Sequence, residues 1–381
     1  MVTPVTTASH KEEIRSALDA ALNATTTDSQ SQLPEDVKTL IWNFSEQVDK
    51  QATSAFTNII TCLASSVAEP ACDPRYHRPP SGEMPAPSTG KTYFTGRTIS
   101  EHVIYPWLAE NGLRGAMSGW QTRVFERERP YTLDYRENIN RVKNEFLGIL
   151  DAVANGRVSA QAVLTEFLRL EAVQRDKRRL TQAALSRATV SEDITIAAVV
   201  DALEEHFSAP LSSRLPVLAM YAIYQAILPE VARYSGRKLA PLAEHSAADQ
   251  HTDAVADVEV VEDNGAVFEA VEVKHLIRID DQIVRRACNK ARRTGVSRYY
   301  VLSTAPSLAI SGTSHGLIKT LRDDHGCQMV LNGVIPTIKY YLRLIGAPPQ
   351  FLEYYKHLLV SDRRVTQAQK EKWQEILKRI S

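Results

Sequence analysis

Residues 256–275 read ADVEVVEDNGAVFEAVEVKH, and this stretch decides the fold of the second half of the chain. Asn264-Gly265 lies between two strand-like runs, which is the strongest short-range signal for a β-hairpin. An alternation of apolar and polar residues marks both runs as half-buried strands. The apolar residues that we expect on one face are Val258, Val260, Val267, Val271 and Val273.

The register of this hairpin brings two carboxylates together. With Asn264-Gly265 as a two-residue turn, Asp263 pairs with Ala266, and counting outward places Asp257 directly opposite Glu272. Side chains in such a pair have Cβ atoms about 5 Å apart. Lys274 follows two residues later and therefore shares the face of Glu272.

Two opposed carboxylates repel each other and require compensation. A divalent cation is the simplest answer, because Mg²⁺ prefers hard oxygen ligands. We therefore predict Asp257 and Glu272 as ligands of Mg²⁺, with Mn²⁺ as a substitute. Lys274 completes a catalytic set with them, because it would orient or deprotonate an attacking water or stabilise a charged phosphate. The alternative is a solvated hairpin face without chemistry.

The pattern after the hairpin alternates between helix and strand. Helices are expected at about 281–294 and 313–325, and buried strands at 298–303 and 327–331. This order is typical of an α/β sheet. Upstream, apolar residues recur at helical spacing, with helices expected at 11–24 and 35–65. The predicted fold class is an α/β C-terminal core with a mixed sheet and a large, mainly α-helical N-terminal region.

Composition suggests five segments. Six prolines between residues 69 and 92 indicate a loop or linker rather than a helix or a central strand. The segments are N-terminal helices at 1–68, this Pro-rich linker at 69–92, a mainly helical region at 93–240, the α/β core at 241–345 and a helical segment at 346–381.

The net charge of zero hides a strong asymmetry. The 381 residues contain 45 Lys+Arg and 45 Asp+Glu. Residues 241–275, however, carry nine acids and one lysine, whereas residues 276–381 carry eighteen Lys+Arg and eight acids. The neutral total therefore does not exclude a nucleic-acid partner. The four cysteines include no CxxC pair, which argues against a zinc or thioredoxin-like site.

A basic cluster follows the acidic hairpin and is a candidate surface for the phosphate backbone of DNA. The alternative is a solvated helix face. Two acids near the hairpin, Glu244 and Glu259, are candidate additional metal ligands, and the alternative for each is a surface charge. The residues of the basic cluster are Arg285, Arg286, Lys290, Arg292 and Arg293.

Residues 114–136 form a second informative segment, with little apolar periodicity and many side chains of the types that read base edges or bind phosphates. We predict a DNA-reading loop, and the alternative is a polar loop whose arginines pair with Glu126, Glu128 and Asp134. The candidate DNA-binding residues are Arg114, Ser118, Trp120, Gln121 and Arg123.

Asp257, Glu272 and Lys274 match the D…ExK pattern of PD-(D/E)xK nucleases, with Ala256 where a proline often precedes the first acid. Five runs of the sequence further resemble the SacI family of type II restriction endonucleases over most of residues 91–345. These runs are GRTISEHVIYPWLAENGLR (96–114), SGWQTR (118–123), PYTLDY (130–135), FEAVEVKH (268–275) and RYYVLST (298–304).

The resemblance implies a homodimeric, Mg²⁺-dependent enzyme that cuts both strands of double-stranded DNA at a short palindrome, GAGCTC being the namesake target. It also implies a cognate DNA methyltransferase that acts without forming a stable complex. Asp257, Glu272 and Lys274 are the residues that carry over as the catalytic set.

Two other classes of function stay open. One is a different PD-(D/E)xK nuclease, such as a repair exonuclease or junction resolvase. The other is a non-enzymatic DNA-binding protein. A dehydrogenase or P-loop kinase is disfavoured, because neither GxGxxG nor GxxxxGK[ST] occurs. The sequence contains no signal-peptide pattern and no apolar run of membrane-spanning length, so we expect a cytoplasmic protein without membrane contact.

Overall fold

The chain folds into two compact units, Met1–Arg179 and Leu180–Ser381. The boundary falls inside the segment 93–240, which the sequence had suggested as one region. The computed structural model describes residues 8–25, 33–48, 52–77, 92–117, 120, 124–125, 127, 129–139, 141–242, 255–306, 310–362 and 364–380.

The first unit is helical, as predicted. Its long helix α7 continues to Arg187 in the second unit. The predicted helical stretch 35–65 contains α2, which buries one face, and most of α3, which is buried on nearly all sides. The helices are α1 (Ala8–Ala24), α2 (Glu35–Gln47), α3 (Thr53–Ala68), α4 (Gly96–Ile99), α5 (Tyr105–Glu110), α6 (Lys143–Ala154) and α7 (Ala160–Arg187), with a π-helical stretch, Ser100–Ile104, before α5.

The second unit contains a five-stranded mixed sheet and confirms the predicted α/β class. The order is β1-β2-β3-β4-β5, antiparallel from β1 to β3 and parallel from β3 to β5. Only β1 was not predicted, because it has three residues and two of them are charged. The strands are β1 (Arg237–Leu239), β2 (Val258–Glu262), β3 (Val267–Lys274), β4 (Arg298–Ser303) and β5 (Gln328–Gly333).

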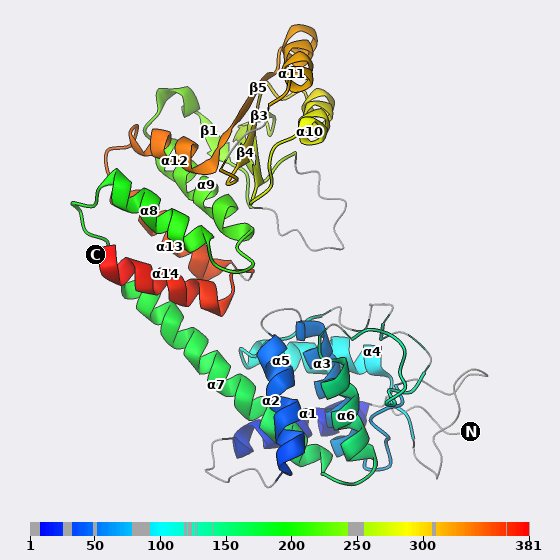
Figure 1. Ribbon diagram of the computed structural model, residues 1–381. Coiled ribbons are helices and arrows are strands. Elements are labelled where there is room, and N and C mark those ends of the chain that lie inside the picture. The colour runs from blue at the N-terminus through cyan, green and yellow to red at the C-terminus, as the bar shows by residue number, and fades with distance from the viewer. Residues whose placement is uncertain are drawn as a thin grey trace. The chain divides into compact units, whose positions relative to one another are not determined.

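Helices cover both faces of this sheet. The helices that connect its parallel strands, α10 and α11, lie together on one face, and α9 and α12 lie on the other (Figure 1). The predicted helix 281–294 and strand 298–303 agree with α10 and β4 residue for residue. The helices of the unit are α8 (Ile196–Phe207), α9 (Arg214–Ile227), α10 (Asp281–Thr294), α11 (Gly312–His325), α12 (Val334–Leu342), α13 (Pro348–Ser361) and α14 (Gln367–Ile380).

The turn of the hairpin differs from the prediction. Glu262, not Asp263, pairs with Ala266, since its N–H donates to the Ala266 carbonyl at 2.9 Å. The loop therefore has three residues, 263–265. Gly265 takes the left-handed conformation (φ 85°) that this longer turn requires.

A β-bulge then restores the predicted register. Val261 pairs with Val267, but Val260 pairs with Glu269, so that Phe268 has no partner in the ladder. From Val260 outward the pairs agree with the prediction. The expected valine face is wrong at one position, because the bulge turns Val267 toward the cluster under α10 and α11.

Candidate functional site

Asp257 and Glu272 meet where β2 begins and β3 ends. The ladder pairs Val258 with Val271, and Asp257 immediately precedes Val258. A carboxylate oxygen of Asp257 accepts a hydrogen bond from the backbone N–H of Val273 at 2.8 Å. The facing position that the sequence predicts for Asp257 is thus fixed by both the strand register and a side-chain contact.

Burial, together with the charge of Glu272, raises the pKa of Asp257 above its ordinary value. The hydrogen bond from Val273 opposes this shift. Its Oδ1 atom has no hydrogen-bond partner among the residues that the structure describes. Asp257 therefore presents one oxygen without a donor, in an environment that disfavours its own negative charge.

Glu272 is held by three donors. Its Oε1 lies 2.6 Å from Lys274 Nζ, and its Oε2 accepts a hydrogen bond from the Tyr299 hydroxyl at 2.7 Å. Lys290 Nζ, from α10, lies 3.4 Å from the same Oε2. Burial raises the pKa of Glu272, but the contacts with Lys274, Lys290 and Tyr299 outweigh this effect and lower it.

The predicted catalytic residues therefore lie in one cluster, which we call the carboxylate–lysine site: Asp257, Glu272, Lys274, Lys290 and Tyr299. Lys290 had been predicted only as part of the basic cluster. Tyr299 was missed, because its role depends on the parallel pairing of Ala270 with Tyr299, which places it on the face of Glu272. Knowing which residues of β3 and β4 pair would have identified Tyr299, but the sequence does not specify the register between these two strands.

Of the two additional acids, Glu259 lies near the site, because its charge contributes to raising the pKa of Tyr299. One carboxylate oxygen of Glu259 accepts hydrogen bonds from the backbone N–H groups of Val255 and Ala256, so this side chain fixes the chain before β2. Glu244 lies outside the described residues. Within the described residues, no group of three or more His, Cys, Asp or Glu side chains is arranged to hold a metal ion.

The donor set of Asp257 and Glu272 nevertheless suits Mg²⁺. Both supply hard oxygen atoms, and Mg²⁺ commonly uses one or two protein carboxylates together with water and phosphate oxygens. Asp257 Oδ1 has no donor among the described residues, and a cation there would offset the charge of Glu272 that contributes to raising the pKa of Asp257. Glu272 already pairs with Lys274, so a cation at this position would compete with that ion pair.

The rest of the basic cluster is displayed on α10. Asp280 caps this helix by accepting a hydrogen bond from Ile283 N at 2.8 Å, and Gly295 (φ 65°) ends it. The buried residues of α10 recur along one stripe, which leaves the basic side chains outside. Among the described residues, Arg285, Arg286 and Arg293 have no salt-bridge partner, and Arg292 donates to Asn289. Their role in binding phosphate remains a prediction.

Part of the segment 114–136 packs into the first unit. Arg114 forms a buried ion pair with Glu171, with Nη2 at 2.6 Å from Oε2. Trp120 is only 2% exposed and contacts the rings of His77, Phe94 and Tyr131. Both side chains are thus occupied within the fold. Ser118, Gln121 and Arg123 lie outside the described residues.

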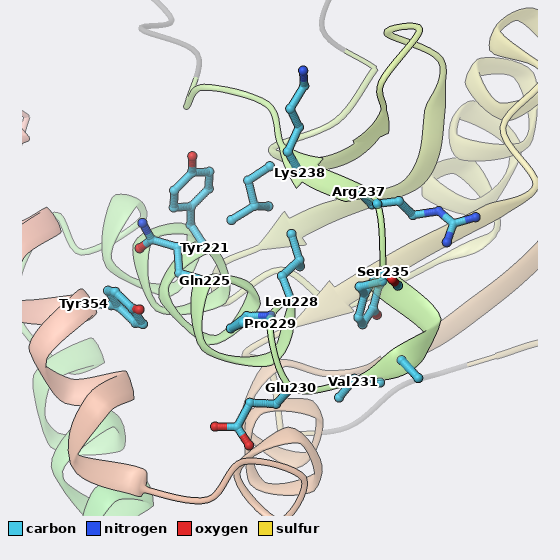
Figure 2. Close-up of a pocket in the computed structure, with 14 residues that line it drawn as sticks. Tyr221, Gln225, Leu228, Pro229, Glu230, Val231, Ser235, Arg237, Lys238 and Tyr354 are labelled. Carbon is cyan, nitrogen blue, oxygen red and sulfur yellow. The ribbon is translucent and has the colours of Figure 1, made fainter.

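A separate cleft of about 690 Å³ opens elsewhere in the second unit. It lies between the end of α9, the turn at 229–236, β1 and Tyr354 of α13 (Figure 2). Tyr221, Leu228 and Leu239 line it. None of its described lining residues belongs to the carboxylate–lysine site, so the cleft is not part of the chemistry above.

Comparison with known proteins adds no family assignment. No family model matches the chain, and no curated protein matches it. Of the helices that the structure describes, none is both long enough and apolar enough to cross a membrane.

Proposed function

We propose that this protein is a Mg²⁺-dependent DNA endonuclease of the PD-(D/E)xK type. The observation that carries the proposal is the carboxylate–lysine site, in which Asp257 and Glu272 face each other and Lys274 lies 2.6 Å from Glu272. Two carboxylates and a lysine at the end of one strand pair match the needs of phosphodiester hydrolysis. When bound, Mg²⁺ would neutralise phosphate charge and make water more acidic.

In the proposed reaction, water attacks phosphorus in line and the bond to the 3′ oxygen breaks, leaving a 3′-hydroxyl and a 5′-phosphate. Lys274 donates to a phosphate oxygen as negative charge accumulates there. Tyr299 and Lys290 keep the Glu272 carboxylate oriented. The side chains of Arg286 and Arg293 lie on the side of α10 that carries Lys290, since these residues are three or four positions apart, and they hold the flanking phosphates.

We further propose that the enzyme is a site-specific type II restriction endonuclease acting as a homodimer, with a cognate methyltransferase protecting host DNA. The five sequence runs that resemble the SacI family support this finer assignment, and GAGCTC is the first target to test.

The test is digestion of a sequenced phage genome with Mg²⁺, followed by mapping of the fragment ends. We expect discrete fragments with 5′-phosphates. Glu272→Gln and Lys274→Met should each cut at least about 100-fold more slowly, which exceeds the usual effect of residues that only support a site. The matched controls, Asp263→Asn in the exposed turn and Lys238→Met on β1, should cut at the wild-type rate.

Wild-type rates for Glu272→Gln or Lys274→Met would refute the nuclease proposal. A smear or cuts restricted to branched DNA would replace the type II assignment by an exonuclease or a resolvase. If calorimetric titration detects no Mg²⁺ binding, with or without DNA, the result would contradict the Mg²⁺-dependent nuclease and favour the non-enzymatic alternative.

A further inference from the structure

Two leucines are held in a conformation that leucine rarely adopts. Leu211 (φ 59°) and Leu276 (φ 55°) are the only residues other than glycine with positive φ in the described part of the chain. This left-handed conformation costs roughly 1–2 kcal/mol for a residue with a Cβ atom. Both side chains are also exposed, at 61% and 72%. Backbone strain that exposes an apolar side chain does not stabilise the fold, and such strain concentrates at functional sites.

Each leucine is next in the chain to one member of a hydrogen-bonded pair: Leu211 precedes Ser212, and Leu276 follows His275. His275 Nε2 lies 2.9 Å from the hydroxyl oxygen of Ser212, and His275 Nδ1 lies 2.9 Å from that of Thr304. Because the Ser212 hydroxyl donates to the carbonyl of Phe207 at 2.6 Å, it accepts from Nε2–H of His275. The Thr304 hydroxyl then donates to Nδ1. His275 thus joins the loop before α9 to the ends of β3 and β4.

The turn after His275 is fixed from a second side. The backbone N–H of Leu276 donates to the Thr304 hydroxyl at 2.8 Å, and the Ser303 hydroxyl donates to the carbonyl of Ile277 at 2.6 Å. Ile277 is itself 51% exposed. One backbone N–H and one carbonyl of this turn are therefore hydrogen-bonded to side chains at the end of β4, while the side chains of Leu276 and Ile277 are exposed to solvent.

This exposed group, which we call the leucine tip (Leu211, Leu276 and Ile277), is linked by the Ser212–His275 hydrogen bond to the end of the strand that carries Lys274. Leu276 follows Lys274 by two residues, and successive Cα atoms are 3.8 Å apart, so the two Cα atoms are within about 7.6 Å. Bases follow one another every 3.4 Å or so along a DNA strand. A strand whose phosphate contacts Lys274 therefore has a base step within reach of Leu276.

We propose that the leucine tip inserts Leu276 between base pairs of duplex DNA beside the cut phosphate and unstacks that step. Apolar side chains serve as such wedges in proteins that kink DNA. The inference rests on the proposed function and adds a substrate-distorting residue to it. Charge favours DNA over a second protein copy. In the sequence, Leu276 and Ile277 follow Lys274 and precede the exposed Arg278 and the basic side of α10.

The experiment uses a duplex that carries 2-aminopurine beside the mapped cut position, with Ca²⁺ in place of Mg²⁺ to hold the uncut complex. Wild type should raise the 2-aminopurine fluorescence several-fold. Leu276→Asn should abolish the rise and slow cleavage with Mg²⁺ by about 10- to 100-fold, as misplacement of a reacting group does. Asn is similar in size and tolerates positive φ, so the variant should melt no lower than wild type.

The matched control is Leu180→Asn, on α7, where leucine is 73% exposed in an ordinary helix. It should keep both the fluorescence rise and the cleavage rate. A full fluorescence rise with Leu276→Asn, or no rise with a wild type that cuts, overturns the wedge and leaves the nuclease intact. Loss of self-association in Leu276→Asn, with unchanged fluorescence, would assign the tip to a protein contact instead. A wild type that cuts no DNA refutes the proposed function, and with it the wedge.

Discussion

Two glutamates on β3, three residues apart, lie on opposite faces of the sheet and have different surroundings. Glu269 is completely buried on the face covered by α9 and α12. It accepts hydrogen bonds from the hydroxyls of Tyr224 and Tyr234 and pairs with Arg233. Each carboxylate oxygen has a donor, and the contacting residues are aromatic or cationic. Glu269 therefore fits a structural role.

Glu272, on the face covered by α10 and α11, also has three donors, but it faces a second carboxylate. Its side chain keeps 12% of its surface exposed, and Asp257 carries an oxygen without a donor. Burial and pairing alone therefore do not separate a structural carboxylate from the catalytic one that we propose. What distinguishes Glu272 is an opposed carboxylate together with lysines that can reach a ligand, and three predictions test this difference.

The largest effect is expected from Glu269→Ala, as a loss of stability. Removing one partner of a buried ion pair typically costs 3–5 kcal/mol, and we expect about 3 kcal/mol because Arg233 is partly exposed. Hydrogen exchange of the β3 amides measures this loss. Glu204→Ala, on the exposed side of α8, should change the same free energy by less than about 0.5 kcal/mol. A loss equal to that of the control would remove the structural role assigned to Glu269.

The next effect concerns Tyr299→Phe on the other face. The Tyr299 hydroxyl donates to Glu272 and so favours its ionised form. Without that donor, the pKa of Glu272 rises, and the acidic limb of the pH–rate profile should move to higher pH. We expect kcat/KM for DNA cleavage to fall about 10-fold. Tyr340→Phe, exposed on α12, should change neither quantity. A slower rate with an unmoved profile would indicate that Tyr299 only fills space.

The smallest effect is a gain in stability from Asp257→Asn, alongside loss of cleavage. Burial and the charge of Glu272 raise the pKa of Asp257 in the folded protein. The stability that Asp257 contributes to the folded state is therefore fully present below its unfolded pKa of about 3.9. It is lost as pH rises through the higher pKa of Asp257 in the folded protein. At pH 7 the variant should be more stable by about 1 kcal/mol, in the range of active-site trade-offs.

The melting temperatures of wild type and Asp257→Asn should converge as pH falls toward 4, since Asp257 is then increasingly protonated. Asparagine keeps an acceptor for the Val273 N–H, so that contact is not lost. A variant that is less stable than wild type at pH 7 would show that the carboxylate is not strained by Glu272.

Local sequence signals predicted the elements around the site well. The apolar stripe of α10, its Asp280 cap and its Gly295 end lie within a few residues of one another, so its bounds follow from the sequence. The sequence also predicted that Asp257 faces Glu272. It did so because two errors cancelled: the turn has one residue more than predicted, which shifts the register by one residue, and the bulge at Phe268 shifts it back. Tyr299 and Lys290 depend on how β4 and α10 pack on β3, and short-range patterns do not contain that information.

The segment 114–136 shows the opposite limit. Its aromatic residues are buried together, but in irregular chain rather than in a helix or strand, so their spacing has no period. The Arg114 side chain pairs with Glu171, which is 57 residues away. A polar, aperiodic composition therefore looked like a surface loop, although part of the segment is core.

The bulge at Phe268 has a consequence for how relatives of this protein can be found. Because Phe268 is unpaired, its deletion would leave a regular ladder with the same partners, and Asp257 would still face the ExK triplet. The interval between the first acid and the triplet can thus shorten by one residue during evolution without moving either carboxylate. Searches that fix this interval would separate proteins with the same strand pairing, whereas searches that follow the pairing would group them.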